Sequence, residues 1–155
     1  MTTATNEGRQ EHGDLDPDGV GFLLGVAHRV RRRQWEAHLA DLGLTAPQAA
    51  VLRLVAAEPG SGVRLLARRL GTDAMNAQRI ADTLVARGLC DTRADPQDAR
   101  RRPLHPTPQG RDLATRVAER AGGDERHLAD ALGTRTYRAL TAALRTVIEL
   151  DTRTG

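Results

Sequence analysis

The 155-residue sequence predicts a mostly α-helical protein that carries one small β-hairpin. Only Phe22, Trp35 and Tyr137 are aromatic, so the core must consist of Leu, Val, Ile and Ala, which favours helices. Through most of the chain apolar residues recur every three or four positions, as on the buried side of a helix. Residues 89–105 differ, because a strand-like alternation there leads into a turn rich in Pro and Asp.

Size and composition limit the classes of protein that the sequence fits. A chain of this length forms one domain with a sizeable core. No apolar run approaches the roughly 20 residues of a membrane span, and the acidic N-terminus does not resemble a signal peptide. Cys90 is the only cysteine, so an intramolecular disulfide is impossible. We therefore expect a cytoplasmic protein without membrane association.

Charge is distributed unevenly along the chain. Lysine is absent, so all 23 basic residues are arginine. Residues 1–20 hold one arginine against five acidic residues, whereas residues 61–120 hold twelve arginines against seven. Residues 1–18 also have almost no apolar content, which predicts a disordered acidic tail. The basic middle predicts a polyanionic partner, since guanidinium groups bind phosphate in a bidentate manner.

The first three helices follow from periodicity and capping residues. Residues 19–40 have helical spacing, and a second helix then begins sharply. Thr45 supplies a capping hydroxyl, Pro47 lies in the first turn, and Gln48 completes a capping box. This helix ends near Glu58, before Pro-Gly. A short third helix follows, with one apolar face made of Val63, Leu66, Ala67 and Leu70.

The fourth helix carries a candidate DNA-reading face. Gly71-Thr72-Asp73-Ala74 forms a four-residue corner in which Thr72 or Asp73 caps the next helix, a helix-turn-helix pattern. The inward stripe is Ala77, Ile80, Ala81, Leu84 and Val85, and the outward side is Asn76, Gln78, Arg79, Asp82 and Thr83. Amide side chains suit adenine and guanidinium suits guanine, so we expect Asn76, Gln78, Arg79 and Thr83 to contact DNA. The alternative is a solvated helix face in an unrelated bundle.

A hairpin follows this helix pair directly. Residues 89–93 predict the outgoing strand and residues 101–105 the return strand, with Arg100, Arg101 and Arg102 at its tip. Pro103 and Pro106 cannot donate ladder hydrogen bonds, which predicts a short return strand at an edge. A helix-turn-helix followed by such a hairpin is a winged helix, and its wing arginines would contact phosphate or an adjacent minor groove.

The remaining residues form a second helical layer. Thr107-Pro108 begins a long helix to residue 132 that is weakened at Gly122-Gly123, and a last helix continues to about residue 150. A winged helix alone does not need these segments. We therefore expect residues 45–106 to form the DNA-binding lobe, flanked by N- and C-terminal dimerisation helices at 19–42 and 107–150.

Several motifs together resemble the MarR family of transcriptional regulators over about residues 20–150. They are LGLTAPQ at 42–48, LLARRLG at 65–71, LVARGL at 84–89, DPQDARR at 95–101 and TPQGR at 107–111. The resemblance implies a single domain from 19 to 155 that forms a homodimer and binds a palindromic operator in double-stranded DNA. It further implies that the protein usually represses transcription and is released by a small ligand.

The resemblance also implies roles for single residues of the wing. In that family an Asp-x-Arg unit holds the hairpin, so Asp98 would orient arginine side chains and Arg100 would reach DNA. Two departures from the family pattern stand out. Met75-Asn76 occupies a place where small hydroxyl residues are common, which predicts an unusual operator. Pro103 and Pro106 replace apolar residues, which predicts a stiffer or shorter wing.

The first helix carries a candidate effector site. Trp35 lies one helical row from His28, Arg31 and His38. We expect an aromatic or anionic effector to stack on Trp35 and pair with Arg31 or His38. The alternative is a tryptophan in the dimer interface with solvated histidines.

Other chemistry has little support in the sequence. Cys90 and His105 would face each other in a symmetric hairpin, which raises the hypothesis of a redox switch with a lowered thiol pKa. The alternative is a small, half-buried strand residue. The histidines show no metal-ligand spacing, so we expect no metal or cofactor. Cys90 with His105 is the only candidate nucleophile–base pair, and it would lie on a DNA-facing hairpin rather than in a cleft, so we expect no enzyme. Two other functions stay open, an architectural winged helix without a ligand and a helical adaptor that binds an acidic protein.

Overall fold

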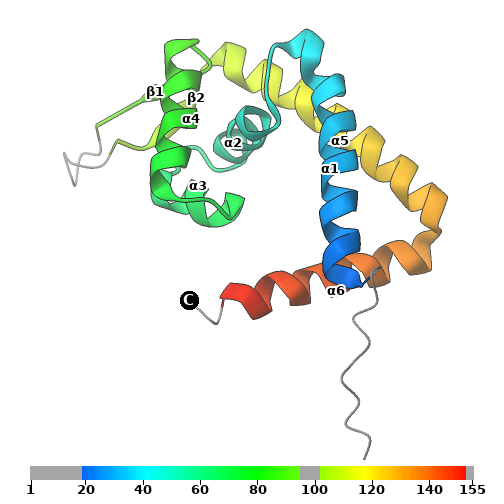
Figure 1. Cartoon of the computed structure of the whole chain (residues 1–155). Coiled ribbons are helices and arrows are strands. Elements are labelled where there is room, and N and C mark those ends of the chain that lie inside the picture. Colours follow the sequence, from blue (N-terminus) through cyan, green and yellow to red (C-terminus); the bar gives the residue numbers. More distant parts are fainter. Residues whose placement is uncertain (1–18, 95–101, 153–155) are drawn as a thin grey trace, which may run out of the picture.

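The computed structural model describes residues 19–94 and 102–152, and it confirms the predicted fold class. Figure 1 shows one lobe of short helices and a hairpin, with long helices beside it. We call the part from α2 to β2 the winged lobe. The elements are α1 (Val20–Leu39), η1 (Ala40–Leu42), α2 (Ala46–Ala57), α3 (Val63–Leu70), α4 (Ala74–Ala86), β1 (Cys90–Thr92), β2 (Leu104–Pro106), α5 (Pro108–Leu132) and α6 (Thr134–Thr152).

The core lies inside the winged lobe and holds the start of α5 and the end of α1 against it. The largest fully buried side chains come from all of these elements: Leu39, Leu52, Leu66, Leu84, Leu104, Val51, Val55 and Val117. The predicted inward stripe of α4 is buried at Ala77, Ile80, Ala81 and Leu84, as expected from its spacing. One face of α4 is therefore held in the core, and its opposite face points to solvent. We call α4, which carries the candidate DNA-reading face, the recognition helix.

Local sequence signals account for where the helices start. The capping box at Thr45 is present, because its hydroxyl accepts from the Gln48 N–H and the Gln48 side chain accepts from the Thr45 N–H. Asp73 caps α4 by accepting from the Asn76 N–H at 2.7 Å, so the corner before α4 is one residue shorter than predicted. Thr107 caps α5 through the Gly110 N–H at 3.0 Å.

The hairpin differs from the prediction at its return strand. β1 and β2 pair antiparallel with Cys90 opposite Pro106, Asp91 opposite His105 and Thr92 opposite Leu104. The return strand begins at Leu104 rather than at residue 101. It is short, as predicted, and among the described residues it is one of the two strands of the sheet, with a single isolated bridge on its other side. Leu104 also bridges to Ser61, because its N–H donates to the Ser61 carbonyl at 3.0 Å. Leu104 lies between the two prolines and keeps its N–H for this bridge, and its carbonyl accepts from the Gly60 N–H at 2.8 Å.

The long helices form a layer with much exposed apolar surface. α5 is unbroken from Pro108 to Leu132, so the predicted weakness at Gly122-Gly123 does not interrupt it. Val20, Phe22, Leu23 and Val30 of α1 are exposed, as are Leu140, Val147 and Ile148 of α6. In the described ranges no single helix has the length and apolar character to cross a membrane, although α1–η1 and α2, bent by 72°, meet these criteria jointly by length and composition alone.

Within the layer of long helices, Arg120 connects α5 to the end of α1 and to η1. Arg120 of α5 donates to both carboxylate oxygens of Asp41, at 2.5 and 2.7 Å, and to the backbone carbonyl of His38. The hydrogen bond from Arg120 holds the pKa of Asp41 at about 2, below the ordinary 3.8. The predicted tail at 1–18 lies outside the described residues.

Candidate nucleic-acid interface and adjoining cavity

The exposed face of α4 presents two of the four predicted reading residues to solvent. Gln78 and Arg79 are both exposed. The Gln78 amide donates to the Asp82 carboxylate at 2.7 Å, which leaves its carbonyl oxygen and one N–H for another partner. Thr83 is half-buried, and its hydroxyl donates to the Arg79 carbonyl within the helix at 2.9 Å. Arg79 and Gln78 are therefore the side chains best placed to meet base edges.

Asn76 has a different environment from its neighbours on α4. It is half-buried, and its amide nitrogen donates to the Thr72 hydroxyl at 2.9 Å. Its amide oxygen accepts from Arg79 at 2.7 Å. The sequence pattern places Asn76 on the outward side, but the structure joins it to the turn before α4.

Three arginines on α3 were not selected by the sequence reasoning. Arg64, Arg68 and Arg69 are exposed on the helix that precedes the recognition helix. Arg69 is paired with Glu58 at 2.5 Å, whereas Arg64 and Arg68 have no ion-pair partner among residues 19–94 and 102–152. The apolar stripe of α3 already indicated their outward position, because it leaves these three positions on the opposite face.

The wing is described only at its base. Asp98, Arg100 and Arg101 lie outside the described residues. Arg102 is exposed two residues before β2. On the outgoing side Arg93 lies 3.4 Å from the Asp91 carboxylate.

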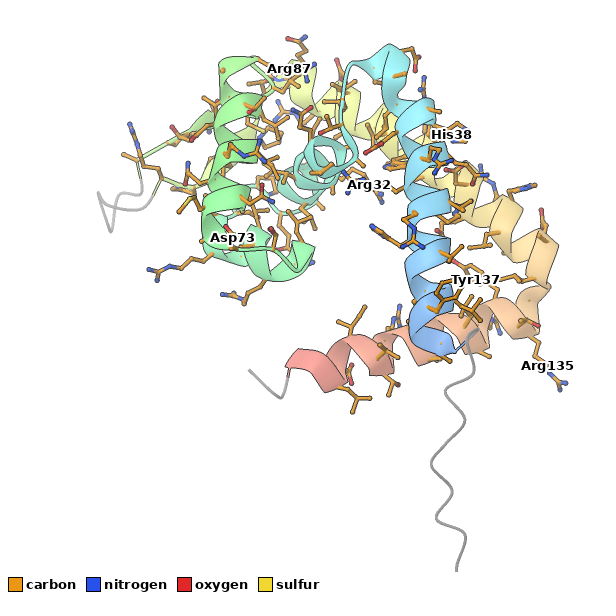
Figure 2. All side chains as sticks on the ribbon, viewed as in Figure 1. Arg32, His38, Asp73, Arg87, Arg135 and Tyr137 are labelled. Atoms are coloured by element: carbon orange, nitrogen blue, oxygen red, sulfur yellow. The ribbon has the colours of Figure 1, made fainter. Side chains whose placement is uncertain are left out.

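A cavity of about 470 Å³ lies behind the recognition helix, where α1, α2, α4 and α5 meet. Trp35 and Arg31 of α1 line it, as predicted, together with Arg53 of α2. Thr72 and Asn76 form part of the opposite wall. Figure 2 shows Arg32 on the side of α1 that faces the winged lobe, consistent with its place in the cavity wall. The start of α4 thus borders both the solvent-exposed face of that helix and the cavity.

The charges around the cavity are only partly compensated. Arg32 is paired with Glu36 at 2.9 Å, and Glu125 accepts from the Tyr137 hydroxyl. Among the described residues, the one hydrogen-bond partner of Arg31 is the neutral Gln34, at 3.5 Å. Arg53 has no hydrogen-bond or ion-pair partner in the described part of the chain. Two guanidinium groups are therefore available to an anion in this cavity.

The predicted effector residue His38 does not line the cavity. It lies near the end of α1, beside α5, where its ring nitrogen is 3.1 Å from the Asp124 carboxylate. This pairing joins residues 86 positions apart in sequence, so helical spacing around Trp35 was no guide to it. Arg53, which does line the cavity, had no sequence signal that separated it from a solvated residue.

Both grounds for the redox hypothesis of Cys90, a facing histidine and a lowered thiol pKa, are contradicted by the structure. His105 lies opposite Asp91 rather than Cys90, and its ring lies close to Gly60. Burial of Cys90, with a smaller contribution from the Asp91 charge, raises the pKa of its thiol to about 11. A raised pKa disfavours the thiolate that oxidation chemistry needs. Across the described residues, no group of three or more His, Cys, Asp or Glu side chains is arranged to hold a metal ion.

Known proteins share both the sequence pattern and the architecture. Residues 42–101 match the sequence model of the MarR family. An uncharacterized protein of Mycobacterium tuberculosis strain H37Rv is 34% identical over 137 residues, which cover 88% of this chain and 83% of that protein. A MarR family protein of Mycobacterium tuberculosis in complex with salicylic acid is 26% identical, with a TM-score of 0.67 over 85% of this chain and 98% of that chain.

A second solved structure is similar over most of its length. The transcriptional repressor CouR, bound to a 23-mer DNA duplex, is 30% identical and has a TM-score of 0.77 over 84% of this chain and 92% of that chain. The family match covers the winged lobe up to residue 101, before β2, and the two structural matches cover 85% and 84% of this chain. The chain therefore belongs to the MarR family of winged helix-turn-helix, DNA-binding transcriptional regulators.

Proposed function

We propose that this chain is a homodimeric repressor that binds a palindromic operator and is released by a small aromatic anion. One observation carries the proposal: the start of α4 has a polar, exposed face on one side and the wall of a cavity on the other. A ligand in the cavity would contact the helix that reads DNA. Differential binding to two states of that helix is what a ligand-controlled regulator requires.

On the DNA side, Gln78 and Arg79 are proposed to contact base edges in the major groove. Arg64 and Arg68 of α3 would contact phosphates, because the first helix of such a pair crosses the backbone. Arg102, with Arg100 and Arg101 beyond the described residues, would supply the wing contacts, and Asp98 would orient them. The 23-mer duplex bound by CouR supports a double-stranded DNA partner.

The DNA contacts are tested with a duplex selected by the protein from a random library. Arg79→Ala should change sequence preference by about 1–3 kcal/mol at the base it contacts, whereas Arg102→Ala should weaken all duplexes by a similar factor. Arg135→Ala is the control, since Figure 2 shows Arg135 on α6 pointing away from the winged lobe. Selection of no sequence would support the architectural winged helix, and no duplex binding at all would support the protein adaptor.

The dimer is proposed because α1 and α6 leave apolar side chains uncovered. Phe22, Leu23 and Ile148 are 56%, 51% and 64% exposed, and no described residue of α6 is buried. A second copy of the chain that covers both helices would remove this surface from water. Ile148→Asp should lower the mass measured by light scattering to that of a monomer. Met75→Asp also replaces an exposed apolar side chain by aspartate, but on α4, and it should leave the mass unchanged.

The effector is proposed from the cavity wall. Trp35 offers an aromatic face, and Arg31 and Arg53 offer two guanidinium groups to a carboxylate. The salicylic acid complex of the mycobacterial relative makes salicylate the first probe. Trp35 is the only tryptophan, so its fluorescence reports on this site alone. Salicylate should quench it saturably, Arg53→Ala should weaken the effect at least fivefold, and Arg33→Ala, an exposed neighbour, should not. Absence of saturable quenching by aromatic acids would reject the effector.

A further inference from the structure

The first turn of α4 places two adjacent residues in opposite surroundings. Met75 is 83% exposed, whereas Asn76 is half-buried and lines the cavity. Neighbouring helix positions are about 100° apart around the axis, so the two side chains cannot face the same partner. The proposed function requires a role for each of them, and their contacts point to different roles.

The hydrogen bonds of Asn76 run along the helix rather than outward. Its amide donates to Thr72 at 2.9 Å and accepts from Arg79 at 2.7 Å. Recognition of adenine by asparagine needs one donor and one acceptor of the amide together. In this chain the Asn76 amide nitrogen already donates to the Thr72 hydroxyl and its oxygen already accepts from Arg79, so the amide orientation is set by these two contacts. Arg79, unlike Asn76, is exposed on the proposed reading face.

We infer that Asn76 is a positioning residue: with Thr72 it holds the guanidinium of Arg79 in the orientation that meets DNA. The inference rests on the proposed DNA-binding function and refines it. Thr72 and Asn76 are also part of the cavity wall, so a molecule in the cavity contacts the two side chains that fix Arg79. The Thr72–Asn76–Arg79 chain thereby links the cavity to the reading face by direct hydrogen bonds.

A double-mutant cycle on the selected duplex tests this chain of contacts. Thr72→Val, which keeps the side-chain size, and Asn76→Ala should each weaken binding about threefold to tenfold, as the loss of one hydrogen bond predicts. In the Arg79→Ala background the same changes should have less than about a twofold effect. Gln78→Ala is the control, because its amide is bonded to Asp82, and its effect should multiply with that of Thr72→Val. Multiplicative losses for Asn76 and Arg79 would overturn the inference.

A second readout separates this inference from the proposed function. In the free protein, NMR should show slow rotation of the Arg79 guanidinium, and Asn76→Ala should make it fast. Fast rotation in the wild type would overturn the positioning role. If the wild type selects no DNA sequence, the proposed function fails, while the guanidinium signal still decides whether Asn76 holds Arg79.

A separate observation indicates that Met75 contacts DNA bases beside Gln78 and Arg79. Among the described residues of the winged lobe it is the only large apolar side chain that is exposed. Gln78 and Arg79 lie three and four positions further on, so all three share one helix surface. The apolar group that the major groove presents is the thymine methyl. We propose that Met75 contacts a thymine methyl and so contributes to operator choice.

Replacement of single thymines by deoxyuridine tests this contact, because it removes only the methyl group. At one position in each half-site the change should weaken wild-type binding about fourfold, the value for burial of one methyl group. Met75→Ala should lose this sensitivity, whereas Arg79→Ala should keep it. Equal sensitivity in Met75→Ala, or a selected site with no methyl-sensitive thymine, would overturn the proposal.

Discussion

Gly110 lies where the first turn of α5 meets the end of the recognition helix, and a methyl group there has no space. A Cβ atom at this position would lie 1.9 Å from the Leu89 carbonyl oxygen, whereas ordinary contact begins at 3.4 Å. The same oxygen accepts from the Thr107 N–H at 3.1 Å and from its hydroxyl at 3.2 Å. Gly110→Ala must therefore push α5 away from Leu89 by more than an ångström, against backbone rather than a flexible side chain.

The expected cost follows from these contacts. Overpacking costs about 1–3 kcal/mol, and loss of the Thr107 hydrogen bond adds about 0.5–1.5 kcal/mol. Urea denaturation should thus show a free energy of unfolding lower by about 2–4 kcal/mol with an unchanged m-value.

Gly123→Ala is the matched control, because the same change is made in the same helix with no atom within 4 Å of the new methyl group. It should raise the free energy of unfolding by about 0.5–1 kcal/mol, since glycine weakens a helix interior. Both variants are compared at one protein concentration, as stability depends on it for a dimer. A Gly110→Ala protein as stable as the wild type would refute the reasoning.

Three further predictions concern single contacts. Thr45→Ala removes the capping box of α2 and should lower the free energy of unfolding by about 1 kcal/mol in urea, whereas an unchanged midpoint would contradict the cap. Native Cys90 should resist alkylation by iodoacetamide at pH 7.5 because its pKa is raised to about 11, and modification at the rate of free cysteine would contradict its burial. Asp41 has a pKa lowered to about 2, so its pairing with Arg120 stabilises the fold above pH 4 and loses this effect as pH falls towards 2. The difference in melting temperature between wild type and Asp41→Asn should accordingly shrink from pH 5 to pH 2.5, and a constant difference would argue against the pair.

Local signals in the sequence predicted most of the helices, because caps and apolar stripes act within a few residues. Thr45, Asp73 and Thr107 each accept from a backbone N–H three residues on, which is why these helix starts are readable. The return strand was predicted too early, because its start depends on the bridge from Leu104 to Ser61, a tertiary contact.

In the candidate site, too, the sequence predicted the features that depend on local spacing and missed those that depend on tertiary contacts. The outward positions of Gln78 and Arg79 follow from helical spacing, as does the place of Trp35 and Arg31 on one side of α1. The partners of Asn76 and His38 do not follow from spacing. Asn76 bonds to a turn residue whose side-chain direction depends on how α3 and α4 meet, and His38 bonds to α5 across 86 positions of sequence. These side-chain partners depend on how the helices pack against one another, which spacing within one helix does not specify.

The unbroken course of α5 has a mechanical consequence for the proposed dimer. Its 25 residues span about 37 Å, so a tilt of about 5° at Gly110 displaces the far end by about 3 Å. Arg120 joins this helix to Asp41 of η1 and to the His38 carbonyl at the end of α1, which restricts relative motion of the two helices. We call α5 together with the end of α1 the arm. In a dimer held together by the outer helices, small rotations of each winged lobe about this arm would change the distance between the two recognition helices. DNA presents its half-sites at fixed helical repeats, so in the proposed dimer a stiff arm would convert a local change at the winged lobe into acceptance or rejection of an entire operator.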